Sequence, residues 1–197
     1  MVKLREAYKK AQEILKENGI EDFKSDAFFL IEGIYKIKRA ELLSDKEVDF
    51  KLLEKALERR INGEPCAYIT GETEFMGFPF KVNKNVLIPR QDTENLIEYL
   101  LEKTKKSAEI LDLCTGSGAI GISLAKYVEN SSVVCVDKFS DTLSVAEKNA
   151  KLNGVCERVK FLKCDVLNEL DKIDGKFDVV VSNPPYISSC EILKLEK

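Results

Sequence analysis

The sequence contains no histidine. Without an imidazole, Ser-His-Asp triads, histidine general bases and zinc sites with mixed Cys/His ligands are all excluded. The six cysteines include no C-x-x-C pair, and we expect them to be free thiols. We therefore predict no metal site, and any catalysis by this chain must proceed without imidazole.

Long apolar runs are missing as well. No stretch approaches the roughly 20 apolar residues that a membrane span requires. The chain begins with Lys3, Arg5 and Glu6 where a secretory signal needs its apolar segment. With 197 residues, 44% hydrophobic and 33% charged, it is long enough for one large domain or two small ones with packed cores. We expect a soluble, cytoplasmic protein.

A surplus of basic residues is also absent. The formal net charge is −3, and acidic and basic residues are interspersed along the chain. A broad basic face, the usual electrostatic signature of nucleic-acid binding, is therefore not expected. This balance weighs against direct binding of DNA or RNA.

The first part of the chain has the pattern of amphipathic helices. Apolar residues recur at helical spacing over residues 3–18, 25–36 and 49–62, and Asp49 has the side chain of an N-cap. Residues 1–63 are therefore predicted to form a small helical bundle.

The pattern of residue types changes after this bundle. Residues 64–90 contain aromatic and β-branched runs between glycines and prolines, which predicts a β-hairpin connector. Asp92 or Thr93 is then expected to cap a helix that runs to about Lys105.

Residues 91–197 show the alternation of an α/β domain. Short apolar strands alternate with helices, and strands that are apolar on both faces indicate a parallel sheet covered on both sides. The predicted strands are 109–113, 132–136, 159–163 and 177–182, and the helices between them are 119–127 and 141–153.

A glycine turn follows the first of these strands. Gly116, Gly118 and Gly121 form G-x-G-x-x-G, a spacing that also serves NAD and FAD, so the glycines alone are a weak signal. Asp112 lies four residues before Gly116. Its carboxylate would repel a pyrophosphate, whereas it can orient the turn or reach the ammonium of a cofactor that carries an amino acid.

Two further acids end the next two strands. Asp137 can accept two hydrogen bonds from ribose hydroxyls. Asp165 can accept from an adenine amino group, and Val166 can pack on the ring. Each acid alone is more often a helix cap or a solvated loop residue. Three acids in order at successive strand ends indicate a ligand site on the rim of an open α/β sheet.

The fourth strand runs into Asn183-Pro184-Pro185-Tyr186. Alone, this tetrapeptide is also compatible with a proline-rich turn that ends a strand. Two successive prolines remove two backbone donors and leave carbonyls that can only accept, which makes a stiff, acceptor-rich loop at the same rim.

This loop suits methyl transfer from S-adenosylmethionine to a planar amide or amino nitrogen. Such a nitrogen is a poor nucleophile, so both of its hydrogens must be held while its lone pair faces the methyl group. The Asn183 side-chain oxygen and the Pro184 carbonyl can accept these hydrogens, and the bonds strengthen as the nitrogen attacks. Tyr186 would stack on the flat acceptor. No histidine base is required.

Taken together, these motifs and the connector resemble the release-factor glutamine methyltransferase (HemK/PrmC) family. The connector resemblance lies in Gly63-Glu64-Pro65 and in the run from Val86 through Pro89 to Glu94. The site resemblance lies in the run from Asp112 to Gly118, in Asp137 and in Asn183-Pro184-Pro185-Tyr186-Ile187. The similarity spans essentially the whole chain, and the connector is its most specific part.

The resemblance implies N5-methylation of the glutamine in the Gly-Gly-Gln loop of peptide chain release factors, with S-adenosylmethionine as the donor. Asn183, Pro184, Pro185 and Tyr186 would hold the glutamine, and the helical domain would help to dock the protein substrate. The cofactor residues that the resemblance implies are Thr93, Cys114, Thr115, Gly116, Ser117, Gly118, Asp137, Val166 and Asn183, and the strand-end pattern adds Asp112 and Asp165.

The chain departs from the family pattern in two places. Cys114 stands where the family usually has glycine, and we expect little effect beyond sensitivity to oxidation. Family members continue for roughly another third and complete a seven-stranded sheet. We therefore expect a fragment with weakened or absent turnover, in which the fourth strand is an exposed edge. The predicted fold is α/β, with a helical bundle and an incomplete Rossmann-like methyltransferase domain.

Three alternatives remain. A nucleic-acid adenine or cytosine amino-methyltransferase uses the same Asn-Pro-Pro-Tyr chemistry on a flipped base, although the acidic balance and the connector argue against it. A non-catalytic fragment would bind the cofactor or the release factor without turnover. An NAD-dependent oxidoreductase is the least favoured, because it assigns no role to Asn183-Pro184-Pro185-Tyr186.

Overall fold

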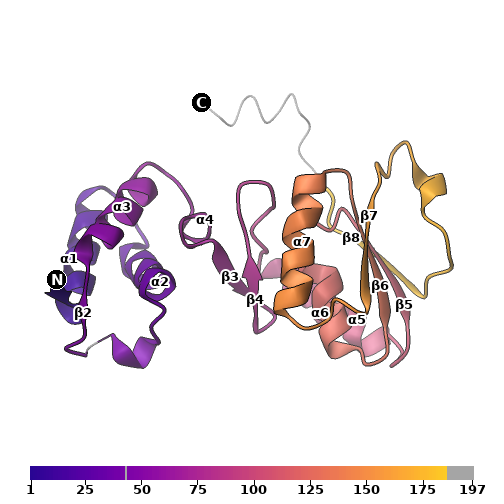
Figure 1. The fold of residues 1–197 in the computed structure, drawn as a ribbon, viewed down its shortest axis with the longest axis horizontal. Coiled ribbons are helices and arrows are strands. Elements are labelled where there is room, and N and C mark those ends of the chain that lie inside the picture. Colours follow the sequence, from indigo (N-terminus) through magenta and orange to yellow (C-terminus); the bar gives the residue numbers. More distant parts are fainter. Residues whose placement is uncertain (43, 186–197) are drawn as a thin grey trace. The chain divides into compact units, whose positions relative to one another are not determined.

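The computed structural model describes residues 1–42 and 44–185. The chain divides into two compact units, Met1–Glu72 and Thr73–Lys197. Figure 1 colours the first unit from indigo to purple and most of the second from magenta to yellow. Within the described residues, no helix combines the length and the hydropathy needed to cross a bilayer.

The first unit is built from the predicted helices. α1 (Leu4–Glu17), α2 (Phe23–Tyr35) and α3 (Phe50–Ile61) each lie within about two residues of their predicted bounds, and the bundle is confirmed. The Lys51 N–H donates to the Asp49 carboxylate at 3.1 Å, which confirms Asp49 as the N-cap of α3. The largest fully buried side chains of this core are Leu4, Leu15, Leu30, Ile31, Leu53 and Leu57.

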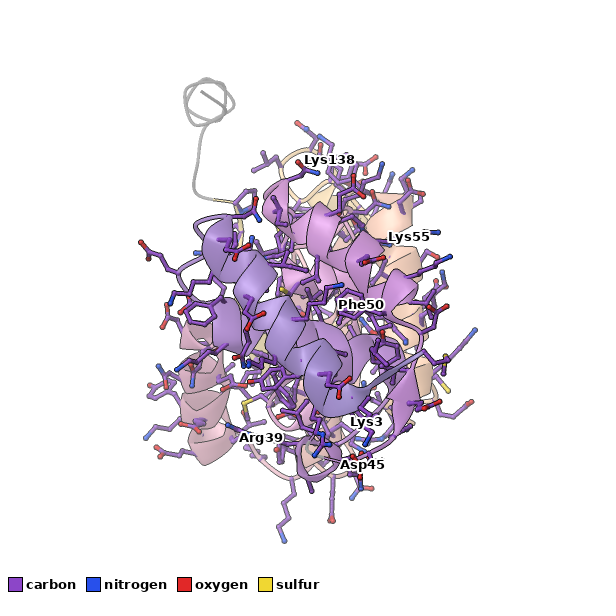
Figure 2. All side chains as sticks on the ribbon, turned by 90° about the vertical axis from the view of Figure 1, so that its left-hand side faces the viewer. Lys3, Arg39, Asp45, Phe50, Lys55 and Lys138 are labelled. Atoms are coloured by element: carbon purple, nitrogen blue, oxygen red, sulfur yellow. The ribbon has the colours of Figure 1, made fainter. Side chains whose placement is uncertain are left out.

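A short strand pair was not predicted. β1 (Val2–Lys3) pairs antiparallel with β2 (Glu47–Val48), and strands of two residues are too short to show a period in the sequence. Beside them, Lys3 and Asp45, both labelled in Figure 2, form an ion pair at 3.2 Å. Both side chains are exposed, so this pair contributes little to stability.

The predicted connector is divided between the two units. Its first part forms the helix α4 (Cys66–Thr70) of the first unit. Most of its second part belongs to the second unit, where β3 (Glu72–Phe75) and β4 (Phe78–Lys81) form the predicted hairpin. The turn residues Met76 and Gly77 both have positive φ, as a type I′ hairpin turn requires.

Burial explains why the hairpin joins the second unit. Phe75 and Phe80 are 2% and 0% exposed, and their rings meet edge to face with centroids 6.0 Å apart. Both rings belong to the hydrophobic core that includes Ile97, Ile110 and other residues of the α/β part. The structural division after Glu72 falls inside the predicted connector, because α4 belongs to the first unit and the two phenylalanines of the hairpin enter the core of the second.

The second unit contains a four-stranded parallel sheet in the order β7-β6-β5-β8, which confirms the predicted fold class. The strands are β5 (Glu109–Leu113), β6 (Ser132–Asp137), β7 (Val159–Lys163) and β8 (Val179–Ser182). The helices are α5 (Asp92–Lys103), α6 (Ala119–Tyr127) and α7 (Ser140–Leu152). Helix α5 begins at Asp92 after Gln91 without a side-chain cap, so the predicted cap at Asp92 or Thr93 is wrong.

The two faces of this sheet are covered differently. Figure 1 shows α5, α6 and α7 together on one side, whereas the chain after β7, with its short 3₁₀ helix η2 (Leu170–Lys172), lies on the other. On that second face, Leu111, Val136 and Cys164 form a small buried cluster. In the described part of the chain, the second face is therefore covered by this loop segment and its short 3₁₀ helix.

Strand β8 lies at the end of this sheet among the described residues, as expected. Val181 is buried at 6% exposed, whereas Val180 is 60% exposed. Asn183 follows directly, so the predicted acceptor loop leaves the sheet at its β8 end.

Gly33 permits the close packing of α2 on α4 within the first unit. A Cβ atom at Gly33 would lie 2.4 Å from Thr70 Cγ2 and 2.7 Å from Thr70 Cβ. Thr70 cannot turn away easily, because its hydroxyl donates to the Cys66 carbonyl at 3.1 Å. The contact must therefore open if a side chain is added.

We predict that Gly33→Ala lowers the free energy of unfolding by about 1–3 kcal/mol, because the clash outweighs the better helix propensity of alanine. Urea denaturation measures the change. The exposed neighbour Glu32→Ala is the control and should stay within about 0.5 kcal/mol of the wild type. A Gly33→Ala protein as stable as this control would contradict the packing of α2 on α4.

Candidate functional site

The four parallel strands bring the predicted site residues to one edge of the sheet. Leu113 at the end of β5 pairs with Val136 of β6 and with Ser182 of β8. The carboxyl ends of these strands therefore lie side by side, and the segments that leave them start from the same edge. These segments carry residues 114–118 after β5, Asp137 at the end of β6, Asp165 and Val166 after β7, and Asn183 after β8.

The glycines of the turn are required for different reasons. Gly116 has φ +57°, and this left-handed conformation favours glycine. Nothing lies within 4 Å of where its Cβ would be, so this side of Gly116, its open side, faces free space. At Gly118, a Cβ would lie 2.6 Å from Ile122 Cδ1. At Gly121, it would lie 2.6 Å from Cys135 Sγ. Gly118 and Gly121 therefore allow the start of α6 to pack closely on its neighbours.

The buried side chain of Asp112 stabilises this turn through hydrogen bonds. The side chain is 1% exposed, and its Oδ2 accepts hydrogen bonds from Thr115 Oγ1 at 2.6 Å and from the Gly121 N–H at 3.0 Å. Its Oδ1 is buried without a hydrogen-bond partner among the described residues. Of the two roles considered for Asp112, the structure shows the orientation of the turn, and contact with a cofactor ammonium stays a prediction.

Burial makes the ionised form of Asp112 unfavourable. Desolvation is the main cause that raises the pKa of this carboxyl to about 6, and the nearby charge of Asp137 acts in the same direction. The hydrogen bonds from Thr115 and Gly121 oppose the shift, because they stabilise the carboxylate. Asp112 is therefore a structural carboxyl whose charge is costly.

Asp137 joins the glycine turn to the next strand. Its Oδ2 accepts from the Gly116 N–H at 3.1 Å, and its Oδ1 accepts from the Phe139 N–H at 3.1 Å. The Thr115 N–H donates to the Val136 carbonyl at 2.9 Å and adds a second link between the turn and β6. A carboxylate has about four acceptor positions, so Asp137 retains capacity for two ribose hydroxyls.

Asp165 is engaged by its own surroundings. Its carboxylate accepts from the Leu167 N–H at 3.2 Å and from Asn168 Nδ2 at 3.0 Å, and it pairs with Lys138 Nζ at 2.9 Å. The hydrogen bond from Lys138 is the main cause that lowers the pKa of Asp165. These three donors leave about one acceptor position on the carboxylate, so contact with an adenine amino group stays a prediction. Lys138 is labelled in Figure 2.

Lys138 was not predicted as a site residue, although it directly follows Asp137 in the sequence. Val166 packs partly buried against the small cluster on the second face of the sheet. Its proposed contact with an adenine ring is not contradicted by this position and stays a prediction.

The acceptor loop begins where β8 meets β5. Ser182 Oγ donates to the Leu113 carbonyl at 2.9 Å, which ties the end of β8 to the strand that carries the glycine turn. Asn183 is partly buried, and Pro184 and Pro185 are exposed. Tyr186, the last member of the predicted motif, lies outside the described residues.

Thr93 lies in the first turn of α5, where its N–H donates to the Arg90 carbonyl at 3.0 Å. This bond lies within the start of α5 and does not bear on a cofactor, so the predicted place of Thr93 near the methionine end of the cofactor stays a prediction.

Family comparisons match both parts of the chain. Residues 6–71 match the PrmC N-terminal domain, and residues 91–194 match the methyltransferase small domain. A release factor glutamine methyltransferase of Clostridium acetobutylicum is 39% identical over 98% of this chain and 70% of its own length. The chain belongs to the release factor glutamine methyltransferase family.

Other relatives of the same name agree. The protein of Flavobacterium psychrophilum is 38% identical over 93% of this chain and 66% of its own length. The protein of Lactococcus lactis is 44% identical over 79% of this chain and 56% of its own length. The chain thus spans between 56% and 70% of the length of these curated relatives.

Cys114, expected above to stand where the family usually has glycine, has an unusual backbone conformation in the structure. Its φ is +58°, a left-handed conformation that favours glycine. Burial and the nearby charges of Asp137, Asp112 and Asp165 raise the pKa of the thiol. Burial first and these carboxylates second disfavour the thiolate, which is the reactive form, so they reduce the expected sensitivity of Cys114 to oxidation.

Three buried polar residues of α7 and its C-terminal end were missed by the sequence analysis. Thr142, Asn149 and Asn153 are 5%, 0% and 7% exposed. Thr142 Oγ1 donates to the Asn85 carbonyl at 3.0 Å, and Asn153 Nδ2 donates to the Pro79 carbonyl at 3.0 Å. Their spacing places them on one helix face, and polar residues on a buried face were the available signal.

The buried carboxyl predicts a pH dependence. Because the pKa of Asp112 rises from 3.8 to about 6 on folding, its stabilising contribution is complete below about pH 3.8 and is lost as the pH rises through about 6. The loss is on the order of 3 kcal/mol. The side-chain amide of an Asp112→Asn variant carries no charge at any pH, so it does not titrate. It keeps an acceptor oxygen for the hydrogen bonds from Thr115 and Gly121.

We therefore predict that the difference in unfolding free energy, wild type minus Asp112→Asn, falls between about pH 4 and pH 6 and is flat above about pH 7. Urea unfolding of both proteins at each pH measures it. A difference that does not change over this range would contradict the buried, ionisable state of Asp112.

Cys114 yields a second prediction. Cys114→Gly should be more stable than Cys114→Ala by about 1 kcal/mol, because both lose the thiol but only alanine keeps a Cβ in the left-handed conformation. Thermal unfolding of the two variants measures the difference. Equal stability would show that the left-handed conformation at residue 114 is not maintained in solution.

Proposed function

We propose that this chain uses S-adenosylmethionine to methylate the side-chain amide nitrogen of the glutamine in the Gly-Gly-Gln loop of peptide chain release factors. Membership in the release factor glutamine methyltransferase family is the observation that carries the proposal. The arrangement of residues at the carboxyl edge of the sheet supports it.

The residues at this edge fit the cofactor. The open side of Gly116 leaves room for a ligand to approach the backbone of the turn. Asp137 has acceptor capacity left for ribose hydroxyls after its two backbone bonds. The unpartnered Oδ1 of Asp112 is a further acceptor beneath the turn. When bound, S-adenosylmethionine supplies an electrophilic methyl group on a sulfonium.

The acceptor loop would position the substrate. The Asn183 side-chain oxygen and the Pro184 carbonyl would accept the two N–H groups of the glutamine amide and direct its lone pair towards the methyl group. These bonds become stronger as the nitrogen acquires positive charge, so they stabilise the transition state more than the ground state. After transfer the nitrogen loses one proton to solvent, and no histidine is needed.

The helical unit would serve the protein substrate. Residues 1–72 form a unit with its own core, separate from the strand-end residues in sequence and in fold. We assign this unit to docking the release factor, and we assign the hairpin to the support of the site. The division of the chain into a docking, a connecting and a methyltransferase segment is part of this proposal.

The test is transfer of radiolabelled methyl groups by the 197-residue chain. Purified release factor should be labelled, and a release factor with Gly-Gly-Ala in its loop should not. Asn183→Ala should lower the rate by at least about 100-fold, because it removes one acceptor of the amide hydrogens. Asn95→Ala, at an exposed position of α5, is the matched control and should retain wild-type activity.

Labelling of DNA or RNA in place of release factor would replace this proposal with a nucleic-acid amino-methyltransferase. If calorimetry detects S-adenosylhomocysteine binding but no protein is labelled, the cofactor part of the proposal stands and the catalytic part fails. Absence of both binding and labelling overturns the proposal.

A further inference from the structure

Asn149 is the most completely engaged of the buried polar side chains on α7. It is 0% exposed. Its Oδ1 accepts from the Lys81 N–H at 2.6 Å, and its Nδ2 donates to the Lys81 carbonyl at 2.9 Å. The same Nδ2 donates to the Ser117 carbonyl at 2.8 Å. A single amide therefore bonds strand β4 of the hairpin and the glycine turn at once.

The bond to Ser117 restrains one peptide group of the turn. The carbonyl of the Ser117–Gly118 peptide is held by Asn149, and its N–H, which belongs to Gly118, donates to the Thr115 carbonyl at 2.9 Å. A peptide group bonded at both ends cannot rotate without breaking one of these bonds. The conformation of the turn is thus set by the protein before a ligand arrives.

Helix α7 supports the same turn at a second point. A Cβ at Gly118 would lie 3.2 Å from the Cβ of Ala146, so Ala146 packs directly beneath Gly118. Ala146 and Asn149 are three residues apart and lie on the same face of α7. One supplies the packing and the other supplies the hydrogen bond that hold the turn.

We infer that Asn149 is a positioning residue for the cofactor site: it fixes the glycine turn in its binding conformation by joining the Ser117 carbonyl to the backbone of β4. The inference rests on the proposed function, because it takes the turn as the part that binds S-adenosylmethionine. Loss of Asn149 leaves the buried Ser117 carbonyl without its partner, so the turn samples other conformations. Binding of the cofactor must then order the turn again, and the free energy of this ordering weakens the affinity.

Asn153 provides a matched control. It lies one turn further along the same face, at the end of α7, and its Nδ2 donates to the Pro79 carbonyl of β4 and to the Asn149 carbonyl, both at 3.0 Å. It is also buried and also binds the hairpin, but no hydrogen bond joins its side chain to the glycine turn among the described residues. Asn153→Ala therefore reports the general cost of a lost helix-to-hairpin bond.

The experiment measures the dissociation constant of S-adenosylhomocysteine by calorimetry for the wild type, Asn149→Ala and Asn153→Ala. All three are measured below their thermal unfolding transitions. We expect Asn149→Ala to bind about tenfold more weakly than the wild type and Asn153→Ala to stay within about twofold, although both unfold at a lower temperature.

Hydrogen–deuterium exchange of residues 114–118 is measured on the same proteins without ligand. Exchange in this segment should be faster in Asn149→Ala and unchanged in Asn153→Ala. If Asn149→Ala does not fold, the isosteric Asn149→Asp takes its place, since it keeps the acceptor for Lys81 and loses the amide donors.

Equal effects of the two alanine variants on affinity and on exchange would overturn the inference and reduce Asn149 to a packing role. Failure of the proposed function is distinguishable. If the cofactor part of that proposal fails, the wild type itself does not bind S-adenosylhomocysteine, and the exchange of the turn still decides whether Asn149 holds it.

Discussion

The buried carboxyl of Asp112 is the constraint on which the site depends. It lies on the helix side of β5, where it accepts from the Thr115 hydroxyl and the Gly121 N–H. These two bonds draw the turn and the first part of α6 onto the strand. Their approach requires glycine at 121, because a Cβ there would meet Asp112 Oδ2 at 3.0 Å. The cost of burial is visible in the raised pKa of Asp112.

From this point, polar contacts continue along the edge of the sheet. Asp137 bonds the Gly116 N–H and so links the turn to β6, and Ser182 bonds the Leu113 carbonyl and so links β8 to β5. Asp165, in turn, is held by Lys138. Each of these strand-end side chains therefore has a structural partner, and a cofactor would add to these contacts without having to create the arrangement.

The hairpin is part of the support of this edge. Its two phenylalanines enter the core of the second unit, and its backbone is bonded by the polar face of α7. The hairpin therefore packs into the core of the second unit and bonds the helix that holds the turn, so it is a structural support and not a flexible linker.

Local regularity explains what the sequence alone determined. The alternation of apolar strands with amphipathic helices predicted β5, β7 and α6 with their bounds, because period and glycine position are properties of neighbouring residues. The order of acids at the strand ends predicted where the site lies, because parallel strands end at one edge. The family motifs then predicted its chemistry.

Tertiary structure decided the contacts between distant residues. Asn149 and Lys81 are 68 residues apart, and no periodic pattern connects an asparagine on a helix to the backbone of a strand so far away. The entry of Phe75 and Phe80 into the second core, the pairing of Lys138 with Asp165 and the left-handed Cys114 were undetermined for the same reason. Side-chain hydrogen bonds and packing depend on which surfaces meet, and that is known only once the chain has folded.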